Sequence, residues 1–181
     1  SLGIDFLLSS TQKAWGIPAG FSICSVSDKM LKKTKNLKNK GYFLDIEVYE
    51  KYYAKQQTPT TPSLPHMFAL KKVLENIEEE TLEGRFQRHI EMSEYTQKWA
   101  FDHDQQLFPE KGCESLTVTC IKNVQNWDVH GMYDRLLTLG YRMDRGYGSL
   151  KGKVFRIPHM GNIYMDDLKI YLNVMDTIIC Q

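Results

Sequence analysis

A single lysine in a segment rich in glycine and proline has the clearest capacity for covalent chemistry in this chain. Lys13 follows an apolar run, Ile4–Leu8, that predicts a buried strand, and glycine or proline stands at positions 16, 18 and 20. Loops at strand ends often carry the reactive groups of α/β proteins. A lysine that loses its proton in a desolvated site attacks carbonyl groups, so Lys13 is a candidate Schiff-base former. The alternative is a solvated loop lysine.

Near the other end of the sequence, one arginine is a candidate for binding a carboxylate. Arg156 lies inside Val154–Ile157, which is otherwise apolar and predicts a strand. A guanidinium among apolar neighbours is unfavourable unless a carboxylate pairs with it. Its planar fork suits a bidentate grip on a substrate carboxylate. The alternative is an edge-strand arginine paired with a structural acid.

Residues 58–62, Thr-Pro-Thr-Thr-Pro, lie directly before a predicted helix that begins near Ser63. The prolines fix φ and remove backbone donors, so this stretch cannot be a regular element. Helix N-termini attract phosphate through unpaired N–H groups and the helix dipole. Thr61, and more weakly Thr58, are therefore candidate phosphate ligands. A rigid connector is the alternative.

Alternating strands and helices must position these residues. A second strand is predicted over residues 21–26, and Asp28 is the expected N-cap of the short basic helix that follows. Three helices are predicted next, over residues 45–56, from residue 63 onward, and over residues 82–103. They are followed by a strand over 116–121 and a helix that Asp128 caps and Gly140 ends. The last elements are a strand over 154–157 and a helix over 168–179.

This order of elements predicts an α/β fold whose C-terminal part is a small α+β domain. The highly charged helix that begins near residue 82 marks a change in composition. We therefore expect two domains, over residues 1–80 and 81–181. A chain of 181 residues is long enough to bury a core in this arrangement.

Composition narrows the classes of partner. The net charge of +1 supplies no overall attraction for a polyanion, and no apolar run reaches the length of a membrane helix. The lysine-rich stretch 29–40 lacks interleaved aromatic residues and reads as a solvated helix face, with nucleic-acid binding as the weaker alternative. No secretory signal and no metal-ligand spacing are seen. The four cysteines, at positions 24, 113, 120 and 180, form no C-x-x-C pair, which favours a cytoplasmic location.

Three motifs in order resemble one family. The run Ser-Ser-Thr-Gln-Lys-Ala-Trp-Gly-Ile-Pro-Ala-Gly at 9–20 is similar to the cofactor-lysine signature of class V aminotransferases, which use pyridoxal phosphate. The run Gln-Thr-Pro-Thr-Thr-Pro at 57–62 and the segment Gly146–Gly161 resemble two further motifs of that family. The resemblance implies the fold of the pyridoxal-phosphate-dependent transferases (fold type I), here as the second half of the large domain with the small C-terminal domain.

The resemblance also assigns roles. It implies that Lys13 binds the cofactor covalently and moves a proton at the substrate α-carbon, and that Arg156 binds the substrate α-carboxylate. It places Thr61 on the cofactor phosphate of a neighbouring subunit, so a homodimer would share the site. Gln12 stands where cysteine desulfurases usually have histidine, which favours an aminotransferase in which Gln12 orients the cofactor. A structural amide is the alternative for Gln12.

The expected reaction is transamination between a small amino acid, alanine or serine, and glyoxylate or pyruvate. The family's upstream segment, which supplies most of the cofactor's cradle, has no counterpart here, so we expect the C-terminal part of such an enzyme, inactive alone. One departure from the family is Pro158, where relatives often have glycine or alanine after the Arg-Ile pair. The alternatives are a non-catalytic folding or dimerisation fragment and, less favoured, a basic-helix nucleic-acid binder.

Overall fold

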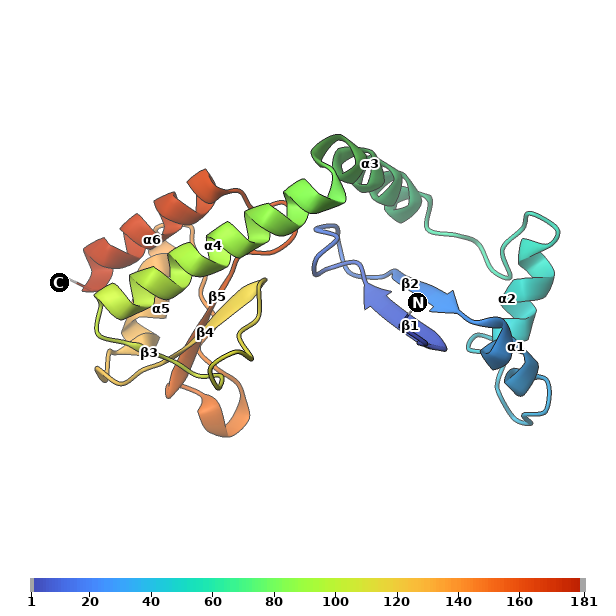
Figure 1. Cartoon of the computed structure of the whole chain (residues 1–181), viewed down its shortest axis with the longest axis horizontal. Coiled ribbons are helices and arrows are strands. Elements are labelled where there is room, and N and C mark those ends of the chain that lie inside the picture. Colours follow the sequence, from blue (N-terminus) through green and yellow to red (C-terminus); the bar gives the residue numbers. More distant parts are fainter. Residues whose placement is uncertain (1, 180–181) are drawn as a thin grey trace. The chain divides into compact units, whose positions relative to one another are not determined.

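The computed structural model describes residues 2–179 and divides the chain into two compact units, Ser1–Glu75 and Asn76–Gln181 (Figure 1). The first unit contains a strand hairpin and short helices: β1 (Phe6–Ser10), β2 (Ser22–Val26), α1 (Asp28–Thr34), α2 (Ile46–Tyr53) and most of α3 (Leu64–Glu80). The second contains α4 (Leu82–Asp102), β3 (Gln106–Leu107), β4 (Val118–Lys122), α5 (Val129–Thr138), the 3-10 turn η1 (Gly148–Leu150), β5 (Val154–Pro158) and α6 (Met165–Ile179). That these units are a cofactor-binding and a small domain stays a prediction.

The first unit is built on an antiparallel pair of strands. In β1 and β2, Phe6 pairs with Val26 and Ser10 with Ser22. The strand predicted at Ile4–Leu8 therefore forms, shifted toward the C-terminus, but the expectation that it is buried is wrong. Leu7 and Leu8 are 55% and 58% exposed, because strand side chains point to the two faces of a sheet and little within residues 2–179 packs on the faces of the β1–β2 pair.

Capping explains how the helices of the first unit begin. Asp28 was expected to cap α1, but Ser27 does so: its hydroxyl accepts the Met30 N–H at 3.1 Å, and Asp28 is the first helical residue. Asp45 caps α2 by accepting the Glu47 N–H. The Thr- and Pro-rich residues before α3 are irregular, as the prolines predict.

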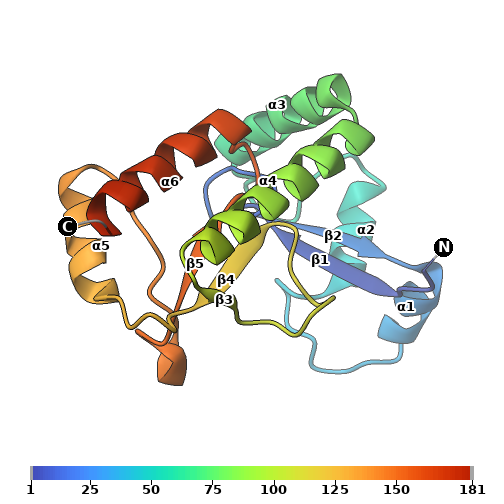
Figure 2. The same ribbon diagram turned by 60° about the vertical axis from the view of Figure 1, so that its left-hand side comes forward.

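The second unit is a three-stranded antiparallel sheet with β4 in the centre and β3 and β5 at the edges. Helices α4 and α6 run beside each other against the sheet, and α5 packs on α6 (Figures 1 and 2). The core lies between these layers and is centred on Phe155, Leu172 and Met175, none more than 1% exposed. The predicted strands and helices of this unit form within a few residues, whereas the two-residue β3 gave no sequence signal.

Pro158 ends β5 without disturbing it. It pairs in register with Val118 at the end of an edge strand, a position that tolerates a missing N–H. No helix within residues 2–179 is both long enough and apolar enough to span a bilayer. The same residues contain no group of three His, Cys, Asp or Glu side chains that could hold a metal ion. Cys24, Cys113 and Cys120 are free thiols, and Cys180 lies outside the described residues.

Candidate active site

Lys13 lies in the loop that joins β1 to β2. Its side chain is exposed and has no hydrogen-bond or ion-pair partner among residues 2–179. The Lys13 carbonyl accepts the Gly16 N–H at 2.9 Å, which closes a tight turn. Gly16 has φ 67°, a conformation that favours glycine. The turn therefore holds the backbone of Lys13 while its amine remains available.

Thr11 anchors the base of this loop. Its side chain is fully buried, and its hydroxyl lies 2.8 Å from the carbonyl oxygen of Pro18 and 3.1 Å from that of Phe21, so one hydroxyl hydrogen serves both acceptors. The Thr11 N–H donates to the same Phe21 carbonyl at 3.2 Å, and the Ile17 N–H donates to the Thr11 carbonyl at 3.2 Å. These bonds tie the two ends of the loop together, so Lys13 extends from a fixed base.

His66 connects the loop to the first turn of α3. Its Nε2 lies 3.1 Å from the Ala19 carbonyl, and its Nδ1 lies 2.7 Å from the Ser63 hydroxyl. A carbonyl only accepts, so Nε2 carries the ring proton and Nδ1 accepts from Ser63. The ring also stacks on Phe21, with centroids 5.8 Å apart. A Cβ at Gly20 would lie 3.2 Å from His66 Nε2, so a side chain there would crowd this contact. The start of α3 is thus held at the Lys13 loop.

The two threonines before α3 differ in what their hydroxyls do. The Thr58 hydroxyl donates to the Thr60 carbonyl at 2.8 Å, whereas the exposed Thr61 hydroxyl has no partner within residues 2–179. The first turn of α3 carries no acidic residue, so no side-chain carboxylate there neutralises the positive end of the helix dipole. Thr61 is therefore better placed than Thr58 to meet an anion. Gln12 is exposed beside Lys13 in the loop.

Arg156 is a residue of the second unit, and the structure gives it an internal partner. On edge strand β5, its Nε and Nη2 donate to Asp144 Oδ1 and Oδ2, each at 2.7 Å. This bidentate bond holds the pKa of Asp144 below its usual value and raises that of Arg156. Burial raises the pKa of Cys120, which pairs with Arg156 across the strands. The geometry is that of an edge-strand arginine paired with an acid, and the substrate role of Arg156 stays a prediction.

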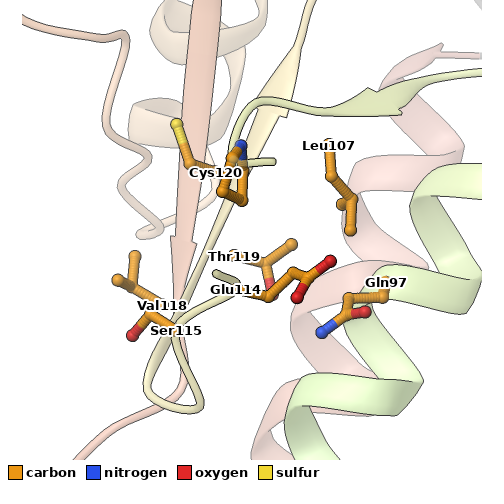
Figure 3. A pocket seen from close by; sticks show the side chains of 8 residues that line it. Gln97, Leu107, Glu114, Ser115, Val118, Thr119 and Cys120 are labelled. Carbon is orange, nitrogen blue, oxygen red and sulfur yellow. The ribbon is translucent and has the colours of Figure 1, made fainter. Parts of the chain in front are cut away.

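One small pocket in the described part of the second unit cannot hold a substrate. It lies between α4, β3 and β4, and Figure 3 shows Gln97 and Glu114 extending into it from opposite sides. Its volume of about 10 Å³ is roughly that of one water molecule. A shallower surface hollow of about 300 Å³ is lined by Phe108, Leu150 and Val154 with neighbouring lysines, and contains none of the predicted site residues.

Sequence reasoning missed three residues that organise these groups: Thr11, His66 and Asp144. Thr11 was part of the lysine motif, and its position at the end of an apolar run before a loop was a signal for an anchoring hydroxyl. His66 lies 47 residues from its partner Ala19, and Asp144 lies 12 residues from Arg156. No periodic pattern in the sequence links either pair.

Known proteins share both the sequence and the fold. The aminotransferase class-V family profile matches residues 1–135. The chain is 29% identical to a soluble hydrogenase small subunit of Synechococcus sp., over 99% of its own length and 47% of the relative's. It is 34% identical to serine–glyoxylate aminotransferase of Arabidopsis thaliana, over 89% of its length and 41% of the relative's.

The solved structure of alanine–glyoxylate aminotransferase from Nostoc sp. superimposes with a TM-score of 0.89 at 26% identity, covering 97% of this chain and 48% of that one. This likeness confirms the predicted fold of the pyridoxal-phosphate-dependent aminotransferases. The chain spans about half the length of the relatives it matches. On the match to residues 1–135, the chain belongs to the class-V aminotransferase family.

Proposed function

We propose that this chain supplies the cofactor-binding lysine and the substrate-binding arginine of a pyridoxal-phosphate-dependent aminotransferase. The substrates proposed are a small amino acid, alanine or serine, and a 2-keto acid, glyoxylate or pyruvate. Relatives named serine–glyoxylate and alanine–glyoxylate aminotransferase support this substrate class. The observation that carries the proposal is the unpaired amine of Lys13, on a loop whose base is tied by Thr11 and whose far end is tied to α3.

The donor set fits a phosphorylated aldehyde. Lys13 offers an amine that pairs with no acidic side chain of residues 2–179, and Thr61 offers a hydroxyl before a helix whose first turn carries no carboxylate. An amine can attach to an aldehyde, and a hydroxyl can donate a hydrogen bond to a phosphate oxygen. Lys13 would hold the cofactor covalently, and Gln12 would orient it without adding charge. Thr61 would contact the phosphate of the cofactor held by the neighbouring subunit.

The chain's own residues would divide the work of the reaction. Pyridoxal phosphate, when bound, supplies an electron sink for the charge that develops at the substrate α-carbon. Arg156 would bind the α-carboxylate of the substrate through its guanidinium. Lys13 Nζ would act as the general base that removes the proton of the substrate α-carbon. The proposed setting is a cytoplasmic homodimer in which Thr61 contacts the phosphate held by the neighbouring subunit.

Borohydride reduction of the full-length protein tests the proposal directly. Protein incubated with pyridoxal phosphate should turn yellow, and reduction followed by peptide mass analysis should place the cofactor on Lys13. We expect Lys13→Ala to lose the label and to lower kcat about a thousandfold or more. Lys32→Ala, which replaces another exposed lysine of the first unit, should behave as wild type. A colourless protein that stays unlabelled would overturn the proposal in favour of a non-catalytic role.

A further inference from the structure

Asp144 occupies one edge of the Arg156 guanidinium and leaves the other open. A guanidinium has five N–H donors, and the two bonds to Asp144 use the Nε–H and one Nη2–H. Within residues 2–179, Nη1 has no hydrogen-bond partner. The Arg156 side chain is 43% exposed, so solvent or a ligand can reach it. One planar, fork-shaped edge therefore remains for a second carboxylate.

The Asp144 carboxylate is itself fixed. Its Oδ1 also accepts the Gly146 N–H at 2.9 Å, and the Asp144 carbonyl accepts the Arg156 N–H at 3.1 Å. Gly146 has φ 79°, and a Cβ there would lie 2.5 Å from the Leu150 carbonyl oxygen, so this turn is closely packed. To swing aside, the Asp144 carboxylate would have to break its bond to the Gly146 N–H as well as its two bonds to Arg156. This anchoring is suited to a fixed clamp and not to a movable gate that competes with the substrate.

The backbone of Arg156 is fixed by the sheet, so only its long side chain needs to be held in place. Its neighbours in β5, Phe155 and Ile157, are 0% and 1% exposed and hold the backbone in the sheet. The arginine side chain has many rotamers, and fixing them before the substrate arrives lowers the entropy cost of binding. The bidentate bond to Asp144 supplies that fixation at the end of the side chain.

We propose that Asp144 is a positioning residue for substrate binding. It holds the Nε–Nη2 edge of Arg156 and presents the Nη1 edge to the α-carboxylate of the amino acid or keto acid. This inference rests on the proposed function of Arg156. Asp144 touches neither substrate nor cofactor and acts entirely through the guanidinium.

A double-mutant cycle in the full-length, cofactor-loaded protein tests this role. The variants are Asp144→Asn, Arg156→Ala and the double substitution. Asp102→Asn is the matched control, because it removes a carboxylate from an exposed ion pair with Lys98 in the same unit. Three quantities are measured: KM and kcat with alanine, and the Kd of pyruvate for the pyridoxal form of the protein, with which pyruvate cannot react because it has no amino group.

We expect Asp144→Asn to raise KM and the pyruvate Kd about tenfold, with kcat within about twofold of wild type. Arg156→Ala should raise both constants about a hundredfold. In the Arg156→Ala background, Asp144→Asn should add no further loss, because its effect passes through the arginine. Asp102→Asn should change neither constant. If Asp144→Asn fails to fold, Asp144→Glu, which keeps the charge but moves it outward, should raise KM at unchanged kcat.

Each contrary result has a distinct meaning. A loss that adds fully to that of Arg156→Ala would make Asp144 merely structural and overturn the positioning role. A lower KM in Asp144→Asn would make it a competitor of the substrate and also overturn the role. Should Arg156→Ala leave KM and Kd unchanged, the proposed function of Arg156 fails as well, a result that Asp144→Asn alone could not give.

Discussion

The two compact units differ in how far they bury their apolar residues. In the second unit, the core between sheet and helices buries residues such as Phe155 and Leu172 almost completely. In the first unit, successive residues of β1 point to opposite faces, and on both faces they are exposed: Phe6 is 43% exposed, Leu7 55% and Leu8 58%. Apolar burial therefore stabilises the unit that carries Arg156 far more than the unit that carries Lys13.

This difference shows how each candidate residue is held. The Lys13 loop depends on specific hydrogen bonds, from Thr11 to the loop carbonyls and from His66 to Ala19. Arg156 stands on a strand already fixed by packing and needs a partner only for the end of its side chain. The position of Lys13 should therefore depend on hydrogen bonds within its loop, and the position of the Arg156 backbone should depend on the hydrophobic core.

The sharpest test of this contrast is a pair of leucine substitutions. Leu172→Ala, in the buried core, should lower the free energy of unfolding of the second unit by about 3 kcal/mol, because it leaves a cavity. Leu8→Ala, on the exposed strand, should change stability by less than about 0.5 kcal/mol. Urea titration followed by far-UV circular dichroism measures both. A large cost for Leu8→Ala would break the comparison and show that another surface covers β1.

His159, the more deeply buried of two buried histidines in the second unit, predicts a pH dependence of stability. Burial, with the neighbouring His89 as a smaller cause, lowers the pKa of His159 to about 4. The unfolded chain binds a proton near pH 6.5, so it takes up more protons than the folded state between these values. The stabilising contribution is complete above pH 6.5 and is lost as the pH falls toward 4. We expect a loss of about 2 kcal/mol between pH 7 and pH 5.

Urea titrations at the two pH values check this expectation, with unfolding of the second unit followed by the fluorescence of Trp99 and Trp127. The titrations use a Trp15→Phe background, because this substitution removes the tryptophan of the first unit. His159→Gln should flatten the pH dependence, although it lowers stability at pH 7 because the bond to Thr119 is altered. His130→Gln, at an exposed histidine of the same unit, is the control and should keep the wild-type slope. An unchanged slope in His159→Gln would contradict the assignment.

The smallest expected effect is in the lysine loop. Thr11→Val keeps the shape of the buried side chain but removes the hydroxyl that serves the Pro18 and Phe21 carbonyls. We expect a cost of about 1 kcal/mol and faster proteolysis after Lys13, because the loop loses its tie. Limited trypsin digestion of the two proteins measures this. Thr58→Val, at an exposed threonine of the same unit, should leave the digestion rate unchanged.

Much of the fold could be predicted from local pattern. Asp128 was expected to cap α5 and does so, by accepting the Gly131 N–H at 3.0 Å, and the apolar stripe of α6 faces the core. These features depend on residues within a turn or two of one another. Burial of β1 could not be predicted from its apolar run alone, because burial depends on what lies against a strand and not on the strand's own residues.

The candidate site was predictable in part for the same reason. Lys13 and Thr61 were found from their local motifs, whereas the His66 bond that holds the start of α3 at the lysine loop required three-dimensional information. For Arg156, the sequence indicated that a carboxylate must be near but could not identify Asp144, since several acidic residues occur in the same half of the chain.

The backbone bond between Arg156 and Asp144 also affects how these molecules behave in concentrated solution. An edge strand such as β5 offers unpaired N–H and C=O groups to strands of other molecules, which is a common route to aggregation. Here the Arg156 N–H is already bonded to the Asp144 carbonyl, and Pro158 has no N–H to offer. The turn that orients the guanidinium therefore also blocks the outer edge of the sheet, so that this edge resists intermolecular strand addition.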